Sequence, residues 1–383
     1  MRICLYTDTA LPKVGGQELV VDSLARQFQN LGQEVVVLAP HPRGPLQAND
    51  RSLPYPVVRH PRFISSRYLV GWYRRWLLQL HRERPFDVLH CHGLYPPGYL
   101  GALCRGTLGV PTVITSHGGD MNEGASRLAK SAVQSRQVQA MISADALVAI
   151  SQFIRGRFQR LCPRAGHVVD IPNGVDVQSF AAAAGRPSDL DPAIQPRRYA
   201  LFLGRLKHRK GVDTLLDALA TVPAAGGVEL VIAGDGGDRD ALHAHCKRLG
   251  LQARVRFVGV TANPAKTYLL QNALCTVVPS RGWEGFPLVV LESYAAGTAV
   301  IATRRPGLDE LIQPGRTGLL VPAESPHDLA AALRQAFADP AGMRRLGDQA
   351  RQVALAYSWE TVARRHLALY EQLPGSPSLR RAG

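Results

Sequence analysis

Short runs of aliphatic and β-branched residues alternate with longer amphipathic stretches along almost the whole chain. This alternation is typical of βαβ units, in which parallel strands are joined by crossover helices. Runs of strand length occur at 2–6, 35–39, 56–59, 87–90, 111–115, 146–150 and 167–171, and again at 199–203, 228–233, 254–258, 275–278, 299–302 and 318–321. The two series predict an α/β protein with two parallel, Rossmann-like sheets.

The boundary between the two series is a stretch of small residues. Residues 181–196 hold three prolines and no apolar periodicity, which indicates a linker. A chain of 383 residues is also too long for one core. We therefore predict an N-terminal Rossmann-like domain over 1–180 and a C-terminal one over 197–356, facing each other across a ligand cleft. We expect the last helix, 357–372, to pack back on the N-terminal domain and 373–383 to form a tail.

Cysteine usage and hydropathy limit the class of protein. Six cysteines occur without a C-x-x-C pair, which argues against a zinc site and against a disulfide framework. No apolar run approaches the roughly 18 to 20 residues that span a bilayer. The opening strand 2–6 is too short for the core of a signal peptide. We expect a cytoplasmic protein.

The net charge of +15 is compatible with an anionic partner, and its densest part is segment 51–84. Eight arginines face one acid, Glu83, in this segment, but no nucleic-acid-binding motif accompanies them. Within it, stretch 66–83 is amphipathic at helical spacing, with aromatic and leucine residues opposite the arginines. Two interpretations stay open: a core-packed helix with a solvated arginine face, or a helix resting on the anionic inner face of a membrane.

Glycine-rich turns follow the first strand of each series. Gly15 and Gly16 precede a periodic helix, but they do not complete the G-x-G-x-x-G pattern of dinucleotide-binding proteins. The loop from Gly204 onward carries four basic residues, of which Arg205 and Lys210 suit a diphosphate. A solvated basic loop is the alternative.

A third glycine-rich loop at Gly234 leads into Asp238-Arg239-Asp240. This D-x-D spelling occurs in metal-dependent sugar transferases. Its position at the start of a helix instead favours Asp238 as a helix cap and Asp240 as a complement to the helix dipole.

Two glutamates stand eight residues apart in the segment 279–297. Glu284 falls in the loop after a strand, and Glu292 falls about two helical turns later among apolar residues. A carboxylate in such surroundings needs a polar partner.

This segment resembles the E-x7-E signature of retaining, nucleotide-sugar-dependent glycosyltransferases of the GT-B fold, the family 4 type. The resemblance extends over most of the chain and keeps the family's order. The further matching motifs are Gly15-Gly16, Asp87-Val88-Leu89-His90, Thr115-Ser116-His117-Gly118-Gly119-Asp120, Asn173-Gly174-Val175-Asp176, Gly204-Arg205 through Lys210-Gly211, and Gly234-Asp235-Gly236.

The resemblance implies roles for individual residues. Glu292 is expected to bind the ribose hydroxyls of the donor, Glu284 and His117 to contact the transferred sugar, and Arg205 and Lys210 to bind the diphosphate and neutralise the leaving group. The expected donor-binding positions are Gly15, Gly16, Gly204, Gly234, Gly285, Phe286, Pro287, Leu288 and Glu292. The Gly15-Gly16 loop is expected to close on the donor phosphate or the acceptor.

Three polar residues are assigned to the acceptor side: His90, His92 and Asp120. The two histidines flank Cys91 at a strand end, where we expect them to point to opposite faces, so a metal site is disfavoured. Trp283 departs from the family pattern at a variable position and is expected to narrow the sugar pocket.

The expected reaction is hexosyl transfer with retention by a front-face mechanism, without a metal or other cofactor. Cations and helix amides stabilise the departing diphosphate in such a reaction. The expected partners are a nucleotide-sugar donor and a glycan or lipid-linked acceptor, with no nucleic acid. A nucleotide-sugar epimerase is disfavoured by the Glu284 to Glu292 signature. A non-catalytic binding module need not keep His117, Arg205, Lys210 and Glu284 together.

Overall fold

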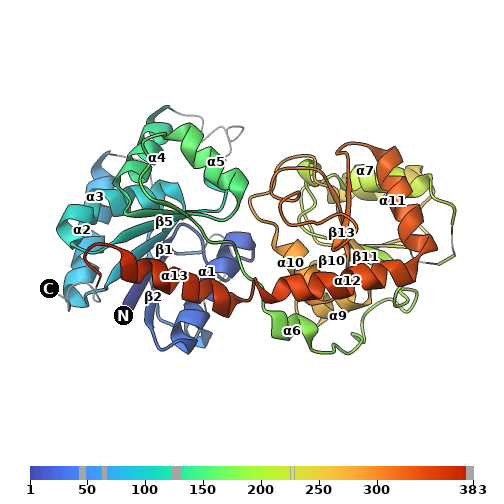
Figure 1. Ribbon diagram of the computed structural model, residues 1–383, viewed down its shortest axis with the longest axis horizontal. Coiled ribbons are helices and arrows are strands. Elements are labelled where there is room, and N and C mark those ends of the chain that lie inside the picture. The colour runs from blue at the N-terminus through green and yellow to red at the C-terminus, as the bar shows by residue number, and fades with distance from the viewer. Residues whose placement is uncertain (43–48, 63–66, 122–130, 225, 228, 377–383) are drawn as a thin grey trace. The chain divides into compact units, whose positions relative to one another are not determined.

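The computed structural model describes residues 1–42, 49–62, 67–121, 131–224, 226–227 and 229–376. The chain forms two compact units, the first from Met1–Asn173 with Trp359–Gly383 and the second from Gly174–Ser358. Each unit holds one parallel sheet with helices around it (Figure 1). The predicted α/β class with two parallel sheets is therefore confirmed. The end of the expected tail, 377–383, and the first part of an expected helix at 126–141 lie outside the described residues.

The sheet of the first unit has seven strands in the order β3-β2-β1-β4-β5-β6-β7. Neighbouring strands are parallel throughout. The strands are β1 (Arg2–Thr7), β2 (Glu34–Pro40), β3 (Val57–His60), β4 (Val88–His92), β5 (Thr112–Ser116), β6 (Ala146–Ala149) and β7 (Val168–Asp170). The central strands β1 and β4 are buried along most of their length, as expected for strands covered by helices on both faces.

The helices of the first unit follow the strands in βαβ order. They are α1 (Gly16–Asn30), α2 (Arg67–Glu83), α3 (Tyr99–Leu108), α4 (Ser131–Ser143), α5 (Gln152–Leu161) and α13 (Trp359–Gln372). Val20, Leu24 and Phe28 give α1 a buried face at helical spacing. Helix α13 comes from the far end of the chain and packs against α1, where the Tyr370 ring lies 5.9 Å from that of Phe28 (Figure 1). The last helix is thus part of the first unit.

The sheet of the second unit has six strands in the order β10-β9-β8-β11-β12-β13. The strands are β8 (Ala200–Leu203), β9 (Leu230–Ala233), β10 (Val255–Gly259), β11 (Cys275–Val278), β12 (Val300–Thr303) and β13 (Gly318–Val321). The helices are α6 (Val177–Ala181), α7 (Val212–Ala220), α8 (Arg239–Arg248), α9 (Ala265–Asn272), α10 (Leu288–Ala295), α11 (Pro326–Ala338) and α12 (Pro340–Leu355). The pleat divides the core into two layers: Phe202 packs with α7, α8 and α11, whereas Leu201 packs with α6, α9, α10 and α12.

The stretch between α6 and β8 contains no helix or strand and lies on the second unit. Ile194 is fully buried there, and the Arg186 side chain donates to the carbonyl oxygens of Ile194 and Asp191. These contacts fix the stretch that the sequence suggests as a linker.

The strand orders determine where ligands are expected. In each sheet the order of the strands reverses once, at β1 and β4 in the first unit and at β8 and β11 in the second. Ligands of open α/β sheets bind at the carboxyl ends of the strands beside such a reversal. The loops after these four strands carry every catalytic residue expected from the sequence except His117, which follows the next strand, β5.

Candidate active site

The loops after β8 and β9 in the second unit pack closely because of their glycines. Gly211 has φ of +68°, and a Cβ atom there would lie 2.1 Å from the carbonyl oxygen of Pro279. Gly234 has φ of +145°, and a Cβ atom there would lie 1.9 Å from the carbonyl oxygen of Gly204. Only glycine fits these positions. Packing between the loops therefore explains why residue 234 is glycine, without the contact to the donor that the sequence suggests.

Glu284 follows β11 and is 7% exposed. Its Oε1 accepts from Lys210 Nζ at 2.8 Å and from Ser280 Oγ at 2.7 Å, and Arg209 Nη2 lies 3.2 Å from Oε2. Burial alone would raise the pKa of Glu284, but the charges of Lys210 and Arg209 outweigh it and lower the pKa. Two of the expected catalytic residues, Glu284 and Lys210, are thus in direct contact.

Arg209 is a site residue that the sequence reasoning missed. Its guanidinium also donates to the carbonyl oxygen of Trp283 at 3.1 Å, so it joins the loop after β8 to the loop after β11. Arg205 lies exposed in the same basic loop. The signal for Arg209 was present, because it is one of the four basic residues between Gly204 and Gly211.

Glu292 lies on α10 and is 9% exposed. Lys266 of α9 is the polar partner that this carboxylate needs, with Nζ 2.9 Å from Oε1. The same ammonium lies 5.0 Å from the centre of the Phe180 ring. Phe286, Pro287 and Leu288 form the turn into α10, where Pro287 is the residue before the first helical position. No sequence motif identified Lys266, because it stands 26 residues before Glu292.

The helix start at Asp238 differs in detail from the expectation. Asp238 does occupy the N-cap position of α8, and Asp240 lies in the first turn, but the Asp238 side chain makes no capping hydrogen bond. In the part of the chain that the structure describes, no group of three or more His, Cys, Asp or Glu side chains is arranged to hold a metal ion.

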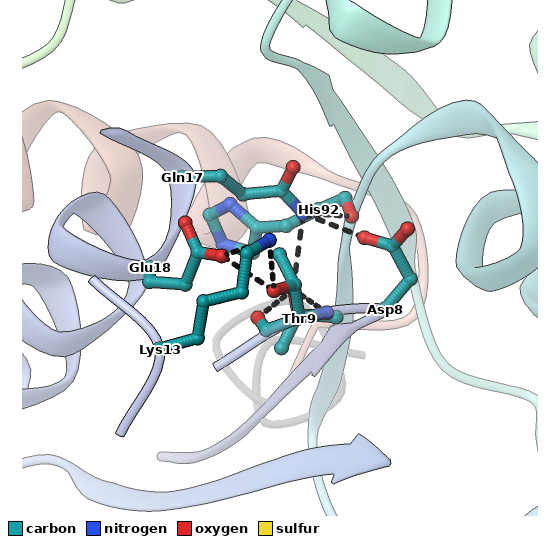
Figure 2. Close-up of polar contacts among 7 residues, drawn as sticks. Asp8, Thr9, Lys13, Gln17, Glu18 and His92 are labelled. Carbon is teal, nitrogen blue, oxygen red and sulfur yellow. Dashed lines mark hydrogen bonds and ion pairs between the residues drawn. The ribbon is translucent and has the colours of Figure 1, made fainter. Parts of the chain in front are cut away.

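In the first unit, the loop between β1 and α1 forms a polar network (Figure 2). Gln17 Nε2 donates to Thr7 Oγ1, to Asp8 Oδ1 at 2.9 Å and to the carbonyl oxygen of His92 at 3.1 Å. One side chain therefore joins the carboxyl ends of β1 and β4. Desolvation by the surrounding protein raises the pKa of Asp8, although part of that side chain is exposed.

Glu18 occupies the amino end of α1 in this network. Its carboxylate is buried, pairs with Lys13 Nζ at 2.7 Å and accepts from Thr9 Oγ1. Burial would raise the pKa of Glu18, but the bonds from Lys13 and Thr9 lower it. A Cβ atom on Gly15 would lie 2.6 Å from Glu18 Oε2, whereas a Cβ atom on Gly16 would meet nothing within 4 Å. Gly15 thus makes room for Glu18, and Gly16 borders open space.

The three candidate histidines of the first unit lie together. His92 Nδ1 is 3.0 Å from His117 Nε2, and the two rings are stacked with centres 5.2 Å apart. His90 and His92 do not point to opposite faces, because residues two apart in a strand share a face. Their ring centres are 4.4 Å apart, so that part of the expectation was wrong.

The three histidines differ in their exposure to solvent. His90 and His92 are fully buried, while His117 is half-buried. Burial lowers the pKa of His117 to about 4 and lowers the pKa values of His90 and His92 well below 6.5. All three are therefore neutral at physiological pH, and of the three only His117 reaches solvent.

Asp120 connects two loops at the same edge of the sheet. Its Oδ1 accepts from Ser116 Oγ at 2.6 Å, and its Oδ2 accepts from the backbone N–H of Leu94 at 2.7 Å. Burial raises the pKa of Asp120. These bonds make Asp120 a support of the loops after β4 and β5.

Family models match both units of the chain. The model described as "Glycosyltransferase Family 4" matches residues 14–179, and the one described as "Glycosyl transferases group 1" matches residues 191–353. The phosphatidyl-myo-inositol mannosyltransferase of Mycobacterium tuberculosis is 32% identical over 390 residues, covering 98% of this chain and 98% of that protein.

Solved structures agree with this relationship. Sucrose-phosphate synthase from Thermosynechococcus elongatus superposes with a TM-score of 0.81 at 26% identity, covering 100% of both chains. Anabaena Alr3699/HepE, solved in complex with UDP, superposes with a TM-score of 0.82 at 23% identity, covering 97% of this chain and 100% of that chain. The chain belongs to the family 4 type of GT-B glycosyltransferases.

Proposed function

We propose that this glycosyltransferase moves a hexosyl group, with retention, from a nucleotide-diphosphate sugar to a hydroxyl group of a lipid-linked acceptor, without a metal. The observation that carries the proposal is the ion-paired cluster of Glu284 with Lys210 and Arg209 at the strand reversal of the second sheet. It combines a buried carboxylate for sugar hydroxyls with fixed cations for a departing diphosphate.

The donor is assigned to the second unit. Glu292 accepts from the ribose hydroxyls, and Lys266 orients this carboxylate through its 2.9 Å contact. Arg205 and Lys210 bind the diphosphate, Arg205 from an exposed position that leaves its guanidinium available. The relative solved with UDP supports a uridine or similar nucleotide as the class of donor.

The chemistry follows from the placement of charge. Cleavage of the glycosyl-phosphate bond moves negative charge onto the diphosphate, where Lys210 and Arg205 stabilise it most strongly in the transition state. Glu284 already accepts hydrogen bonds from Lys210 and Ser280, which disfavours attack by this carboxylate on the sugar. We therefore assign Glu284 to orienting the sugar. This favours a front-face reaction with retention. Neutral His117 hydrogen-bonds the sugar and adds no charge.

The acceptor is assigned to the first unit. The phosphatidyl-myo-inositol mannosyltransferases, whose name gives a lipid acceptor, align over 98% of this chain. No described helix is both long and apolar enough to cross a bilayer. Helix α2 offers a surface instead: Trp72 is 43% exposed beside exposed Arg74, Arg75 and Arg82, while Tyr73 is buried. We assign this surface to the anionic cytoplasmic face of the membrane.

A panel of nucleotide sugars with lipid-linked and soluble acceptors tests the function. We expect release of nucleoside diphosphate together with a glycosylated lipid, and a product whose anomeric configuration by NMR equals that of the donor. Full activity in EDTA is expected. An epimerised donor, or donor binding without turnover for every acceptor, would overturn the transferase proposal, and an inverted anomer would overturn retention.

A further inference from the structure

Four histidines form a cluster inside the first unit, and only His117 has a role in the proposed reaction. The His90 ring centre lies 4.4 Å from that of His92 and 5.3 Å from that of His366 on α13, and His92 stacks on His117. Burial lowers the pKa of His366 to about 4, as it does for His117. Each neutral imidazole carries one N–H and one bare nitrogen, so the direction of every hydrogen bond in the cluster matters.

Tyr370 determines which atom donates in the hydrogen bonds at the His90 end of the cluster. Burial raises the pKa of its hydroxyl well above 10, so the proton stays on the oxygen. Among the hydrogen bonds of the described residues, its partner is His90 Nδ1 at 2.7 Å, and Tyr370 therefore donates to that nitrogen. Neutral His90 then carries its proton on Nε2 and donates to Thr115 Oγ1 at 2.7 Å. The Thr115 hydroxyl proton is left to point at another acceptor.

At the other end of the cluster, a backbone carbonyl determines which nitrogen of His366 carries the proton. Its Nδ1 lies 2.9 Å from the carbonyl oxygen of Val362, and a carbonyl only accepts, so Nδ1 carries the proton. Its Nε2 is bare and buried, and it has no hydrogen-bond partner among the residues that the structure describes. His92 Nε2 is also buried and has no hydrogen-bond partner among these residues. An unsatisfied buried nitrogen is costly, and here there are two.

These unsatisfied atoms belong to residues that line one small cavity. His92, Thr115 and His366 form part of its wall, and Asn173 contributes another polar side chain. The remaining wall is largely apolar, from residues such as Val20, Leu24, Ile150 and Trp359. The cavity volume is about 10 Å³, which corresponds to about one water molecule.

We propose that this cavity binds one water molecule, which accepts from Thr115 Oγ1 and donates to His366 Nε2 and His92 Nε2. His92 then carries its proton on Nδ1 and donates it to His117 Nε2 across 3.0 Å. His117 is left with its own proton on Nδ1. The water thereby fixes the tautomers of His92 and His117, while Tyr370 and the Val362 carbonyl fix those of His90 and His366.

His92 is a positioning residue in this arrangement, and the consequence for catalysis rests on the proposed role of His117. Tyr370 and His366 both come from α13, so the helix that returns to the first unit determines which nitrogen of His117 is protonated. Glu18 acts on His117 through its charge and Arg365 acts on His366, and both stay unchanged in the variants below.

Two substitutions at one position separate the water from simple packing. In His366→Gln the amide oxygen reaches about as far as Nε2 and still accepts from the cavity, whereas in His366→Asn the amide reaches only about as far as Nδ1. Long-range ¹H–¹⁵N NMR of the full-length, ligand-free protein with labelled histidine reads the tautomer of His117. We expect a single Nδ1–H tautomer in the parent protein and in His366→Gln, and a mixture in His366→Asn.

A third variant and a control complete the NMR experiment. Tyr370→Phe removes only the hydroxyl that sets the direction and should also give a mixture at His117. His60→Phe is the matched control, because His60 is another buried histidine whose Nε2 has no partner in the described part of the chain, and it does not line the cavity. It should leave the His117 tautomer unchanged. A parent His117 protonated on Nε2, or identical spectra for the Gln and Asn variants, would overturn the proposal.

A crystal structure and turnover give two further readouts. Electron density should show one water within hydrogen-bond distance of His92, Thr115 and His366, and an empty cavity would contradict the assignment. His366→Asn should lower kcat by about tenfold or more at unchanged donor KM, since a wrong imidazole tautomer impairs a catalytic histidine, and His366→Gln should stay within about twofold. If the parent protein transfers no sugar, the proposed function is wrong. The NMR spectra and the crystal structure still test whether a water occupies the cavity, because neither depends on turnover.

Discussion

Lys266 Nζ lies 2.9 Å from Glu292 Oε1 and 5.0 Å from the centre of the Phe180 ring. The ammonium therefore balances the buried carboxylate while its other side rests on an aromatic face. Helices α6, α9 and α10 are tied together at this point. The carboxylate assigned to the ribose is held in place before any donor arrives.

Glu292→Gln should weaken donor binding by about 1.5 to 3 kcal/mol, because a charge-assisted bond to the ribose hydroxyls is lost. Lys266→Met is the matched control, since it breaks the same ion pair and keeps the carboxylate. Both variants should unfold more easily by about 1 to 3 kcal/mol, but Glu292→Gln should raise the donor Kd in calorimetry more than Lys266→Met, which loses only the orientation of the carboxylate. Equal affinities in Glu292→Gln and the parent protein would remove Glu292 from the donor site.

Lys210→Met and Arg205→Ala should each lower kcat by about 10² to 10³, because their charges act mainly when the diphosphate departs. Arg254→Met is the control. Arg254 pairs with buried Glu229 before the first residues of β10 and β9, at the opposite edge of the sheet from the site. It should lower the melting temperature and leave kcat unchanged. Early melting with full turnover in the Lys210 variant would make the basic loop structural.

Gly16→Ala should keep or slightly raise stability, by up to about 1 kcal/mol, because alanine suits the first turn of α1 and the added Cβ meets nothing within 4 Å. If the backbone of this loop approaches the substrate, the same methyl group should lower kcat/KM sharply. Gly15→Ala differs, since its Cβ would displace the Glu18 carboxylate and should cost stability. Full activity in a well-folded Gly16→Ala variant would separate this loop from substrate binding.

The stability of the protein should fall as the pH is lowered below 6.5. Burial lowers the pKa of His366 from 6.5 to about 4. Between pH 6.5 and pH 4, His366 is therefore protonated in the unfolded chain and neutral in the folded chain. This contribution is fully present above pH 6.5 and is lost as the pH falls toward 4, at a total of about 3 kcal/mol. His366→Gln should make the pH dependence of urea unfolding shallower by one proton. An unchanged slope would contradict the assigned pKa.

The sheets and the loops at their carboxyl ends were predictable because apolar periodicity and parallel topology are local signals. Glu284 and Lys210 lie in such loops, and the sequence singled them out by the spacing of the two glutamates and by the basic residues that follow Gly204. Lys266 was not singled out, because helix α9 brings it to Glu292 from 26 residues away. The face shared by His90 and His92 followed from the strand period and was nevertheless misassigned. Tyr370 joins them from 280 residues away, through packing that no local pattern shows.

The last prediction concerns helix α2 and the membrane. Exposed Trp72 stacks on Trp76 with ring centres 6.5 Å apart, and the neighbouring arginines point to solvent. The sequence pattern places Trp72 with Tyr73 on the face opposite the arginines, whereas in the structure Tyr73 is buried and Trp72 is exposed. An aromatic edge beside arginines suits the interface of an anionic bilayer, where each basic residue contributes about 1 kcal/mol. The full-length protein should therefore float with liposomes containing acidic lipid and not with neutral liposomes, and high salt should release it.

Changing Arg67, Arg74, Arg75 and Arg82 to Ser should abolish flotation and leave transfer to a water-soluble acceptor analogue unchanged. The control variant also loses four positive charges, but at exposed arginines outside α2: Arg160, Arg164, Arg248 and Arg344. Flotation of the control should persist, because a surface helix needs its charges next to its aromatic edge and a general net charge is not enough. Equal loss in both variants would reduce the effect to net charge. Absence of flotation on acidic liposomes would make α2 a scaffold helix and a soluble acceptor the better assignment.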